Sequence, residues 1–179
     1  LYAQWTANKY TVAYNANGGS GTMATDTVSY GTGYVTKTNA FTRTGYTFKG
    51  WNEKADGTGT DWTSWIGKSW TWTYTKNITL YAQWKLTKYK ITYKLNGGKN
   101  AKKNPTAYTY KTSTIKLKNP TRKGYVFKGW YLDKKFKKKV TVINKGSSGN
   151  KTLYAKWKKK YLCPTSGSEH LKGYHNAFS

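Results

Sequence analysis

The chain has 179 residues and carries 32 basic against 6 acidic side chains, a formal net charge of +26. Aromatic residues make up 17% of it, mainly 17 Tyr and 9 Trp, and such side chains favour β-strands with a core built from rings. A single Cys excludes an intramolecular disulfide framework, and no stretch approaches the roughly 20 apolar residues of a membrane helix. We therefore expect a mainly β protein with no membrane insertion.

Residues 1–9 are interpreted as the end of a preceding repeat and a linker. Their Leu-Tyr-Ala-Gln-Trp sequence at 1–5 occurs again at 80–84 and, with one change, at 153–157. A motif that recurs in this way is the signature of a repeat architecture. The chain is therefore expected to be a piece of a longer protein that contains further repeats.

The first predicted module covers residues 10–84. Apolar and polar side chains alternate over 10–14, which predicts a strand with one buried face. The Asn-Gly-Gly sequence at 17–19 predicts a tight turn after this strand. The block Gly-Tyr-Thr-Phe-Lys-Gly-Trp at 45–51 predicts a second strand, whose glycines permit a bulge or a close backbone approach. The motif at 80–84 predicts the final strand, and any helix between these blocks is expected to be short.

The second predicted module covers residues 85–157 and repeats the same blocks in the same order. Asn-Gly-Gly returns at 96–98, Gly-Tyr-Val-Phe-Lys-Gly-Trp at 124–130 and Leu-Tyr-Ala-Lys-Trp at 153–157. Three blocks in one order indicate a true tandem repeat. The residues that follow, 158–179, form a basic C-terminal stretch of unknown structure.

This order of blocks resembles the Listeria–Bacteroides repeat, also known as the B repeat of listerial internalins. The resemblance implies a fold class that is mainly β, with tandem β-grasp-like small α+β modules that contain little helix. It also implies an extracellular or bacterial cell-surface location. Family members are regarded as spacers or adhesive modules, and the resemblance brings no catalytic residues and no cofactor.

Charge separates the two modules. Residues 10–84 carry a net charge of +2, whereas residues 85–157 carry +20, with Asp133 as their only acidic residue. So much charge on a small module costs stability through self-repulsion, so a binding role is favoured over simple solubility. Lysine, a hydrated point charge, suits low-specificity attraction. The residues expected to bind polyanions are Lys102, Lys103, Lys134, Lys135, Lys137, Lys138, Lys139, Lys158, Lys159 and Lys160.

The predicted function is that of a stalk and low-specificity adhesin for anionic surface polymers of the teichoic acid or glycosaminoglycan type. Nucleic acid fits the charge equally well but is less favoured, because the rings that could stack on bases are already needed as core. One alternative is a purely structural spacer or self-assembling repeat, whose lysines serve only solubility.

The other alternative is a carbohydrate-binding module that uses four tryptophans found only in the first module. These are Trp62, Trp65, Trp70 and Trp72. Trp70, Trp72 and Tyr74 would share one face of a strand. The rings either fill a core that is poor in Leu and Ile, or stack on sugar rings while Asp61 or Asn52 binds hydroxyl groups. Burial of all four rings would exclude the second interpretation.

Catalytic and metal-binding chemistry is not expected. Cys163, His170 and His175 could form a three-ligand metal site, or Cys163 with His170 a nucleophilic pair, but neither spacing matches a strong pattern. The Asp- and Gly-containing run at 56–61 lacks the carboxylates of a calcium loop, and a glycine-rich hairpin loop is favoured there. We therefore expect no enzyme activity, no metal and no cofactor.

Overall fold

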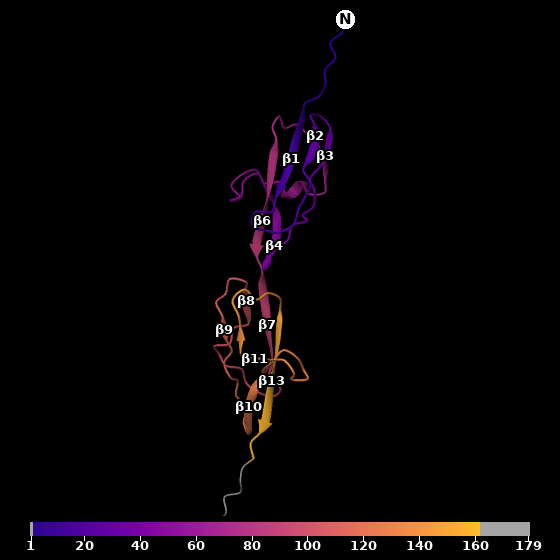
Figure 1. Cartoon of the computed structure of the whole chain (residues 1–179). Helices are drawn as coiled ribbons and strands as arrows, with labels where there is room; N and C mark the ends of the chain where they lie inside the picture. The colour runs from indigo at the N-terminus through magenta and orange to yellow at the C-terminus, as the bar shows by residue number, and fades with distance from the viewer. Residues whose placement is uncertain (1, 162–179) are drawn as a thin grey trace, which may run out of the picture.

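The fold was analysed in a computed structural model that describes residues 2–161. It consists of two β modules that lie end to end along one axis (Figure 1). Repeat 1 comprises β1 (Lys9–Asn15), β2 (Asp26–Ser29), β3 (Gly33–Val35), β4 (Tyr46–Asn52), the 3-10 turn η1 (Thr63–Trp65), β5 (Ser69–Thr71) and β6 (Ile78–Leu86). Repeat 2 comprises β7 (Lys88–Lys94), β8 (Ala107–Thr109), β9 (Ile115–Lys116), β10 (Tyr125–Tyr131), β11 (Lys139–Val140), β12 (Val142–Ile143) and β13 (Lys151–Lys159).

Each repeat is built on one mixed sheet. The strand order is β2-β1-β6-β4 in repeat 1 and β11-β10-β13-β7-β8 in repeat 2. The first and last strands of each repeat, β1 with β6 and β7 with β13, pair in parallel. The mainly β tandem fold is therefore confirmed, and these sheets are compatible with a β-grasp-like module. The sole helical segment among the described residues is η1, which spans three residues.

The repeated blocks take the places that their patterns predict. The strand predicted at 10–14 is β1, with Val12 fully buried and Tyr14 nearly so. The glycines of the second block do permit a bulge, because the register shifts between Phe48 and Gly50 and again at the same place in β10. The Leu-Tyr-Ala-x-Trp strand lies at the centre of each sheet, between two neighbours. Its alternate residues consequently form the middle of the core.

The Asn-Gly-Gly turns are hydrogen-bonded to the central strand of each sheet. Asn17 has a φ of 46° and Asn96 a φ of 49°, in the left-handed region that Asn tolerates better than most residues. The amide of Asn17 donates to the carbonyls of Ala55 (2.7 Å) and Ala82 (2.9 Å). Among residues 2–161, the amide of Asn96 donates to the carbonyl of Ala155 alone, at 2.9 Å. The tight turn is confirmed, and its side chain also ties the turn to β6 or β13.

Rings fill both cores. Trp51 and Trp130 are 0% and 2% exposed, and their ring N–H groups donate to the carbonyls of Lys37 and Lys118. Each ring meets a tyrosine edge to face, at centroid distances of 5.0 Å for Tyr14 and 5.2 Å for Tyr93. Such pairs contribute about 0.5–1.5 kcal/mol beyond their buried area. Aromatic packing thus adds to a small set of buried aliphatic residues, such as Val12 and Leu80 in repeat 1 and Ile91 and Leu153 in repeat 2.

Candidate functional site

Repeat 2 displays lysines on the solvent face of its sheet. On β7, Lys90 and Lys94 alternate with core residues, so they point to the opposite face. β13 lies beside β7 and β10 beside β13, and their outward positions extend the same surface. We call this surface the lysine face. Its members are Lys90, Lys94, Lys128, Lys156 and Lys158.

The counterparts of the lysine face in repeat 1 are mostly neutral. Lys90, Lys94 and Lys156 correspond to Thr11, Asn15 and Gln83, as the matching registers of the two sheets show. The other two members, Lys128 and Lys158, correspond to Lys49 and Lys85. The shared fold therefore accepts neutral residues at these places, and their charge in repeat 2 is not required by the sheet.

The dense lysine run predicted at 134–139 covers the loop between β10 and β11 and the first residue of β11, Lys139. We call this segment the 134–139 loop. Asp133 organises this loop by accepting hydrogen bonds from the backbone N–H groups of Lys137 and Lys138. These bonds, above all the one from Lys138, hold the pKa of the Asp133 carboxyl below its usual value. The Phe136 ring packs on Tyr131, and the Lys156 ammonium lies 5.5 Å from the centre of each ring. The loop is thus ordered, with Lys134, Lys135, Lys137, Lys138 and Lys139 exposed.

The ten predicted polyanion-binding lysines do not form one cluster. Lys102 and Lys103 are exposed in the connection between β7 and β8. Lys158 and Lys159 belong to β13, where Lys159 pairs with the first residue of β10, and Lys160 follows. The seven residues of β10 separate that end of the sheet from the 134–139 loop by about 20 Å. The lysine face, of which sequence reasoning named only Lys158, lies between these groups.

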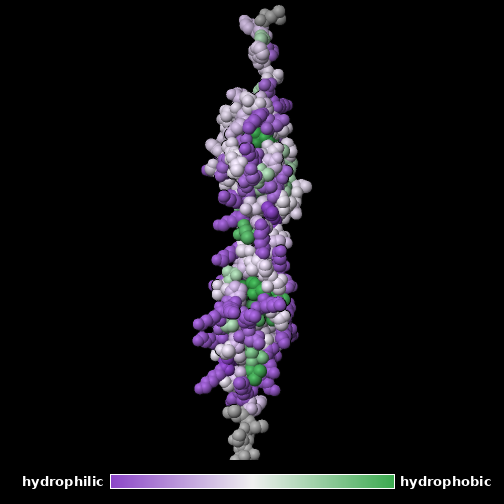
Figure 2. Space-filling model, turned by 90° about the vertical axis from the view of Figure 1, so that its left-hand side faces the viewer, coloured by the Kyte–Doolittle hydropathy of each residue, from purple (hydrophilic) through white to green (hydrophobic). Residues whose placement is uncertain are grey.

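Carboxylates neutralise little of this charge. In the part of the chain that the structure describes, both ion pairs belong to repeat 1, Lys37 with Asp26 and Lys76 with Glu53. The carboxylate of Asp133, the only acidic residue of the second module, accepts hydrogen bonds from backbone N–H groups. Figure 2 shows long hydrophilic side chains standing out along repeat 2, the lower module. Repeat 2 therefore carries a field of positive charge without internal compensation.

A second surface lies on the aromatic side of repeat 1, around the small β3–β5 sheet. A pocket of about 380 Å³ is lined there by aromatic rings and short polar side chains. Its lining residues are Thr60, Asp61, Trp62, Trp65, Trp70, Thr71, Thr73 and Tyr74. The Trp70 ring contacts two other rings of the pocket, with centroid distances of 5.3 Å to Trp62 and 5.7 Å to Trp65.

The four predicted tryptophans divide between core and surface. Trp72 is 0% exposed and Trp62 only 2%, so both rings serve the core, as the first of the two interpretations expects, and neither is exposed enough to stack on a ligand. Trp70 is half-buried, and Trp65 is 45% exposed at the mouth of the pocket. Whether a ring is buried depends on the partner strand that covers it, which the alternation of residues 70–74 does not reveal. Trp65 and Trp70 are the rings that a ligand could reach.

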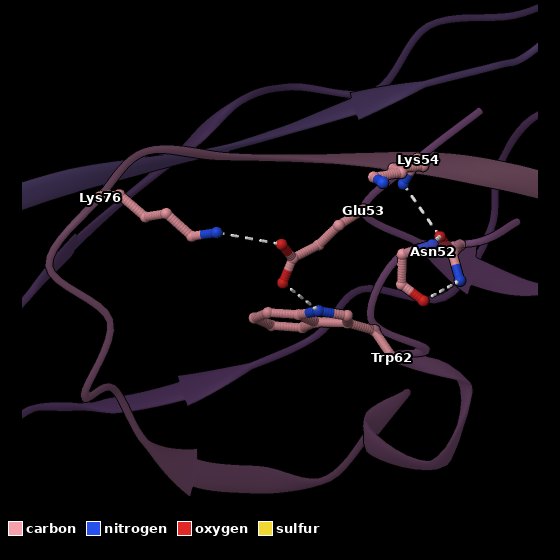
Figure 3. A network of polar contacts seen from close by, with 6 residues as sticks. Asn52, Glu53, Lys54, Trp62 and Lys76 are labelled. Carbon is pink, nitrogen blue, oxygen red and sulfur yellow. Dashed lines mark hydrogen bonds and ion pairs between the residues drawn. The ribbon is translucent and has the colours of Figure 1, made fainter. Parts of the chain in front are cut away.

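Polar contacts hold the pocket wall in place (Figure 3). The ring N–H of Trp62 donates to Glu53 at 3.1 Å, and the other oxygen of Glu53 binds Lys76 at 3.2 Å. At the pocket rim, hydrogen bonds from the side chain and the backbone of Thr63 lower the pKa of Asp61. Asp61 is therefore an ionised acceptor beside the exposed ring of Trp65.

Asn52 has a structural role, so its predicted contact with sugar hydroxyls is wrong. Its side chain is buried, and its amide donates to the carbonyls of Gly57 and Gly59. Its oxygen accepts from the backbone N–H groups of Lys54 and Gly59. The run at 56–61 is thus a loop folded around Asn52, as a glycine-rich hairpin loop should be.

Metal and membrane features can be assessed for residues 2–161. No group of three or more His, Cys, Asp or Glu side chains in this range could hold a metal ion. No helix in the same range is long and apolar enough to cross a membrane. Cys163, His170 and His175 lie outside the described residues, so the metal site and the nucleophilic pair considered for them stay untested.

Comparison with known proteins defines the class. The Listeria-Bacteroides repeat domain matches the chain twice, over residues 10–83 and 89–156. The chain belongs to this family.

Its relatives are longer proteins. Over 164 residues it is 34% identical to a Gly-rich protein of Evansella cellulosilytica, provisionally named as a membrane protein; the match covers 88% of this chain and 18% of that protein. Over 126 residues it is 34% identical to Internalin H of Listeria monocytogenes, covering 70% of this chain and 21% of the internalin. The chain spans about a fifth of the length of these relatives. Tandem repeats of this kind are thus shared with an internalin.

Proposed function

We propose that the chain is a non-catalytic stalk of a bacterial surface or secreted protein, and that repeat 2 binds anionic surface polymers with low specificity. The lysine face carries this proposal. Its members lie on three neighbouring strands, and such strands are about 4.8 Å apart in a sheet. Among the described residues, no lysine of repeat 2 forms an ion pair. The anions of a phosphate or sulfate polymer would relieve the repulsion among these lysines, and the polymer would release its counterions on binding.

The binding surface extends over three neighbouring strands, which suits an extended polymer better than a small ligand. Lysine ammonium groups are mobile point charges and impose little geometry on their partner. The 134–139 loop, held by Asp133, extends the charged surface beyond the edge of the sheet. Teichoic acids and sulfated glycans share the required chemistry, a regular line of anions. The internalin relationship supports a surface location for such a polymer.

The test is the salt dependence of binding to lipoteichoic acid, measured by isothermal titration calorimetry. One variant replaces three members of the lysine face by their repeat 1 counterparts, Lys90→Thr, Lys94→Asn and Lys156→Gln. A matched control carries Lys49→Gln, Lys54→Gln and Lys68→Gln, which remove three exposed lysines from repeat 1. Both variants lose the same charge, so they differ only in where it is lost.

The proposal predicts that affinity falls steeply as salt rises. The slope of log affinity against log salt should fall by up to about 3 in the lysine-face variant, about one for each lysine that no longer pairs with a phosphate, and little in the control. If the slope falls equally in both variants, binding depends on the net charge of the protein and not on the position of the lysines. Absence of binding at about 0.1 M salt would leave the spacer function. Much tighter binding to DNA of the same charge would favour nucleic acid as partner.

The aromatic pocket supports a second candidate, carbohydrate binding by repeat 1. A pocket of about 380 Å³ with an exposed indole, threonine hydroxyls and the ionised Asp61 has the components of a sugar site. Binding of neutral oligosaccharides should then be insensitive to salt and abolished by Trp65→Ala, which removes an exposed ring. Unchanged tryptophan fluorescence over an array of neutral glycans would reject this candidate.

A further inference from the structure

The two repeats meet at a joint with defined contacts. β6 ends at Leu86 and β7 begins at Lys88, so a single residue, Thr87, connects them. The Thr87 N–H donates to the carbonyl of Gly45 at 3.0 Å. Its hydroxyl lies 2.8 Å from that of Thr47. These bonds fix the path of the chain as it leaves repeat 1.

A tyrosine from repeat 2 completes the joint. Tyr110, in the turn after β8, lies against Gly45 so closely that a Cβ at Gly45 would overlap its side chain. Gly45 has a φ of +81° and is buried. The position therefore needs glycine for two reasons, its left-handed backbone and the tyrosine that covers it.

The same two parts recur at the outer ends of the two repeats. In repeat 2, Gly124 takes the place of Gly45, with a φ of +76°, and the Lys160 N–H donates to its carbonyl at 2.8 Å as Thr87 does to Gly45. Among the described residues, however, no atom lies within 4 Å of a Cβ built on Gly124, and Gly124 is exposed. At the other end, Tyr30 follows β2 as Tyr110 follows β8, and it is 48% exposed.

The glycine end also exposes apolar surface. Val126, which corresponds to Thr47 at the joint, is 42% exposed. The neighbouring Tyr125 ring makes a cation–π contact with Arg122, whose guanidinium lies 3.7 Å from the ring centre. Arg43 and Tyr46 make the same contact at the joint, at 4.3 Å. The far end of repeat 2 thus has the same glycine and the same Arg–Tyr pair as the joint, but among the described residues no tyrosine covers the glycine as Tyr110 covers Gly45.

We propose that the surface around Gly124 and the turn that carries Tyr30 are docking surfaces for further modules of this fold in the same polypeptide. Each would repeat the contact between Gly45 and Tyr110, so that successive modules continue the rod with one fixed rotation. The partner is a tethered module, because the contact is small and separate chains repel one another through their charge of +26. A short connection raises the effective concentration to the millimolar range, where a small contact is sufficient.

The existing joint provides the first test. Spin labels at Lys54→Cys and Lys134→Cys, with Cys163→Ser, report the distance between the repeats by double electron–electron resonance. Tyr110→Ala should broaden a narrow distance distribution. Tyr30→Ala is the matched control, since it removes the equivalent ring from repeat 1, away from the joint, and it should leave the distribution narrow. A broad distribution in the parent protein, or no effect of Tyr110→Ala, would overturn the proposal.

The second test lengthens the chain. Residues 1–160 are followed directly by another copy of residues 88–160, so that Lys160 takes the place of Thr87. In about 0.5 M NaCl, which screens the repulsion between the two basic copies, labels in repeat 2 and the added copy should give a narrow distribution. Alanine at the tyrosine of the added copy that corresponds to Tyr110 should broaden it. A broad distribution in the lengthened chain would refute the docking surface at Gly124.

Discussion

Trp51 and Trp130 occupy the same place in the two repeats, each buried and each donating its ring N–H to a backbone carbonyl. The loops that follow them share a backbone hydrogen bond, from Glu53 to Thr60 in repeat 1 and from Leu132 to Lys138 in repeat 2, but their side chains differ. In repeat 1 the loop leads to a cluster of rings around Trp70. In repeat 2 the loop itself is the run of lysines, held by a single carboxylate, Asp133. One sheet thus supports two unlike surfaces, so the differences between the repeats inform about function and the similarities about folding.

The largest effect is expected on the stability of repeat 1, whose core contains a cluster of tryptophans that repeat 2 lacks. Trp72→Ala removes a fully buried ring and should cost about 3–5 kcal/mol of unfolding free energy. Amide hydrogen exchange followed by mass spectrometry should show faster exchange in repeat 1 and an unchanged rate in repeat 2. Trp65→Ala, at a ring that is 45% exposed, is the control and should cost far less. Similar destabilisation by both would mean that Trp72 is not a core residue.

A smaller difference is expected at the turns. Asn17 donates two hydrogen bonds and Asn96 one, in the same backbone conformation. Asn17→Ala should therefore destabilise its repeat by about 1 kcal/mol more than Asn96→Ala, the net worth of one hydrogen bond. Urea denaturation of the two variants measures the difference. Equal destabilisation would show that the bond to Ala55 contributes nothing.

The subtlest difference concerns alkaline pH. Burial, and then a hydrogen bond between the two hydroxyls, raises the pKa of Tyr34, and burial raises that of Tyr14. In repeat 2, burial raises the pKa of Tyr93 to about 12. Folded tyrosines then keep protons that the unfolded chain loses above pH 10 or so, so stability should fall as pH rises through that range.

Tyr34→Phe should weaken this fall in repeat 1 and leave that of repeat 2 unchanged. Tyrosinate absorbance, followed together with hydrogen exchange from pH 9 to about pH 12, measures both. Stability that rises over this range would contradict the sign derived from the raised pKa values.

Much of the fold could be predicted from the sequence. The alternation at 10–14 and the repeated blocks locate β1, β4 and β6, because period-two burial and turn residues are local properties. The small β3–β5 and β9–β12 sheets could not be predicted, since their strands are two or three residues long and depend on partners far along the chain. The central place of β6 is likewise a matter of long-range pairing.

The candidate sites were only partly predictable. Local density marks the lysine run of the 134–139 loop, but the lysine face needs cross-strand register to bring Lys94 beside β13 and Lys156 beside β10. A signal was present in residues 88–94, where Lys alternates with Tyr and Ile, and it shows which face of β7 carries charge. The tryptophans needed more, because the same alternation fits a buried and an exposed ring.

Lysine footprinting is the most direct test of polyanion binding by repeat 2. The intact chain is acetylated with and without bound lipoteichoic acid, and mass spectrometry gives the protection of each lysine. We expect strong protection of the lysine face and the 134–139 loop, and little at Lys49, Lys54 and Lys68. Uniform protection of both repeats, or stronger protection of repeat 1, would contradict the claim that the charge of repeat 2 forms the binding surface.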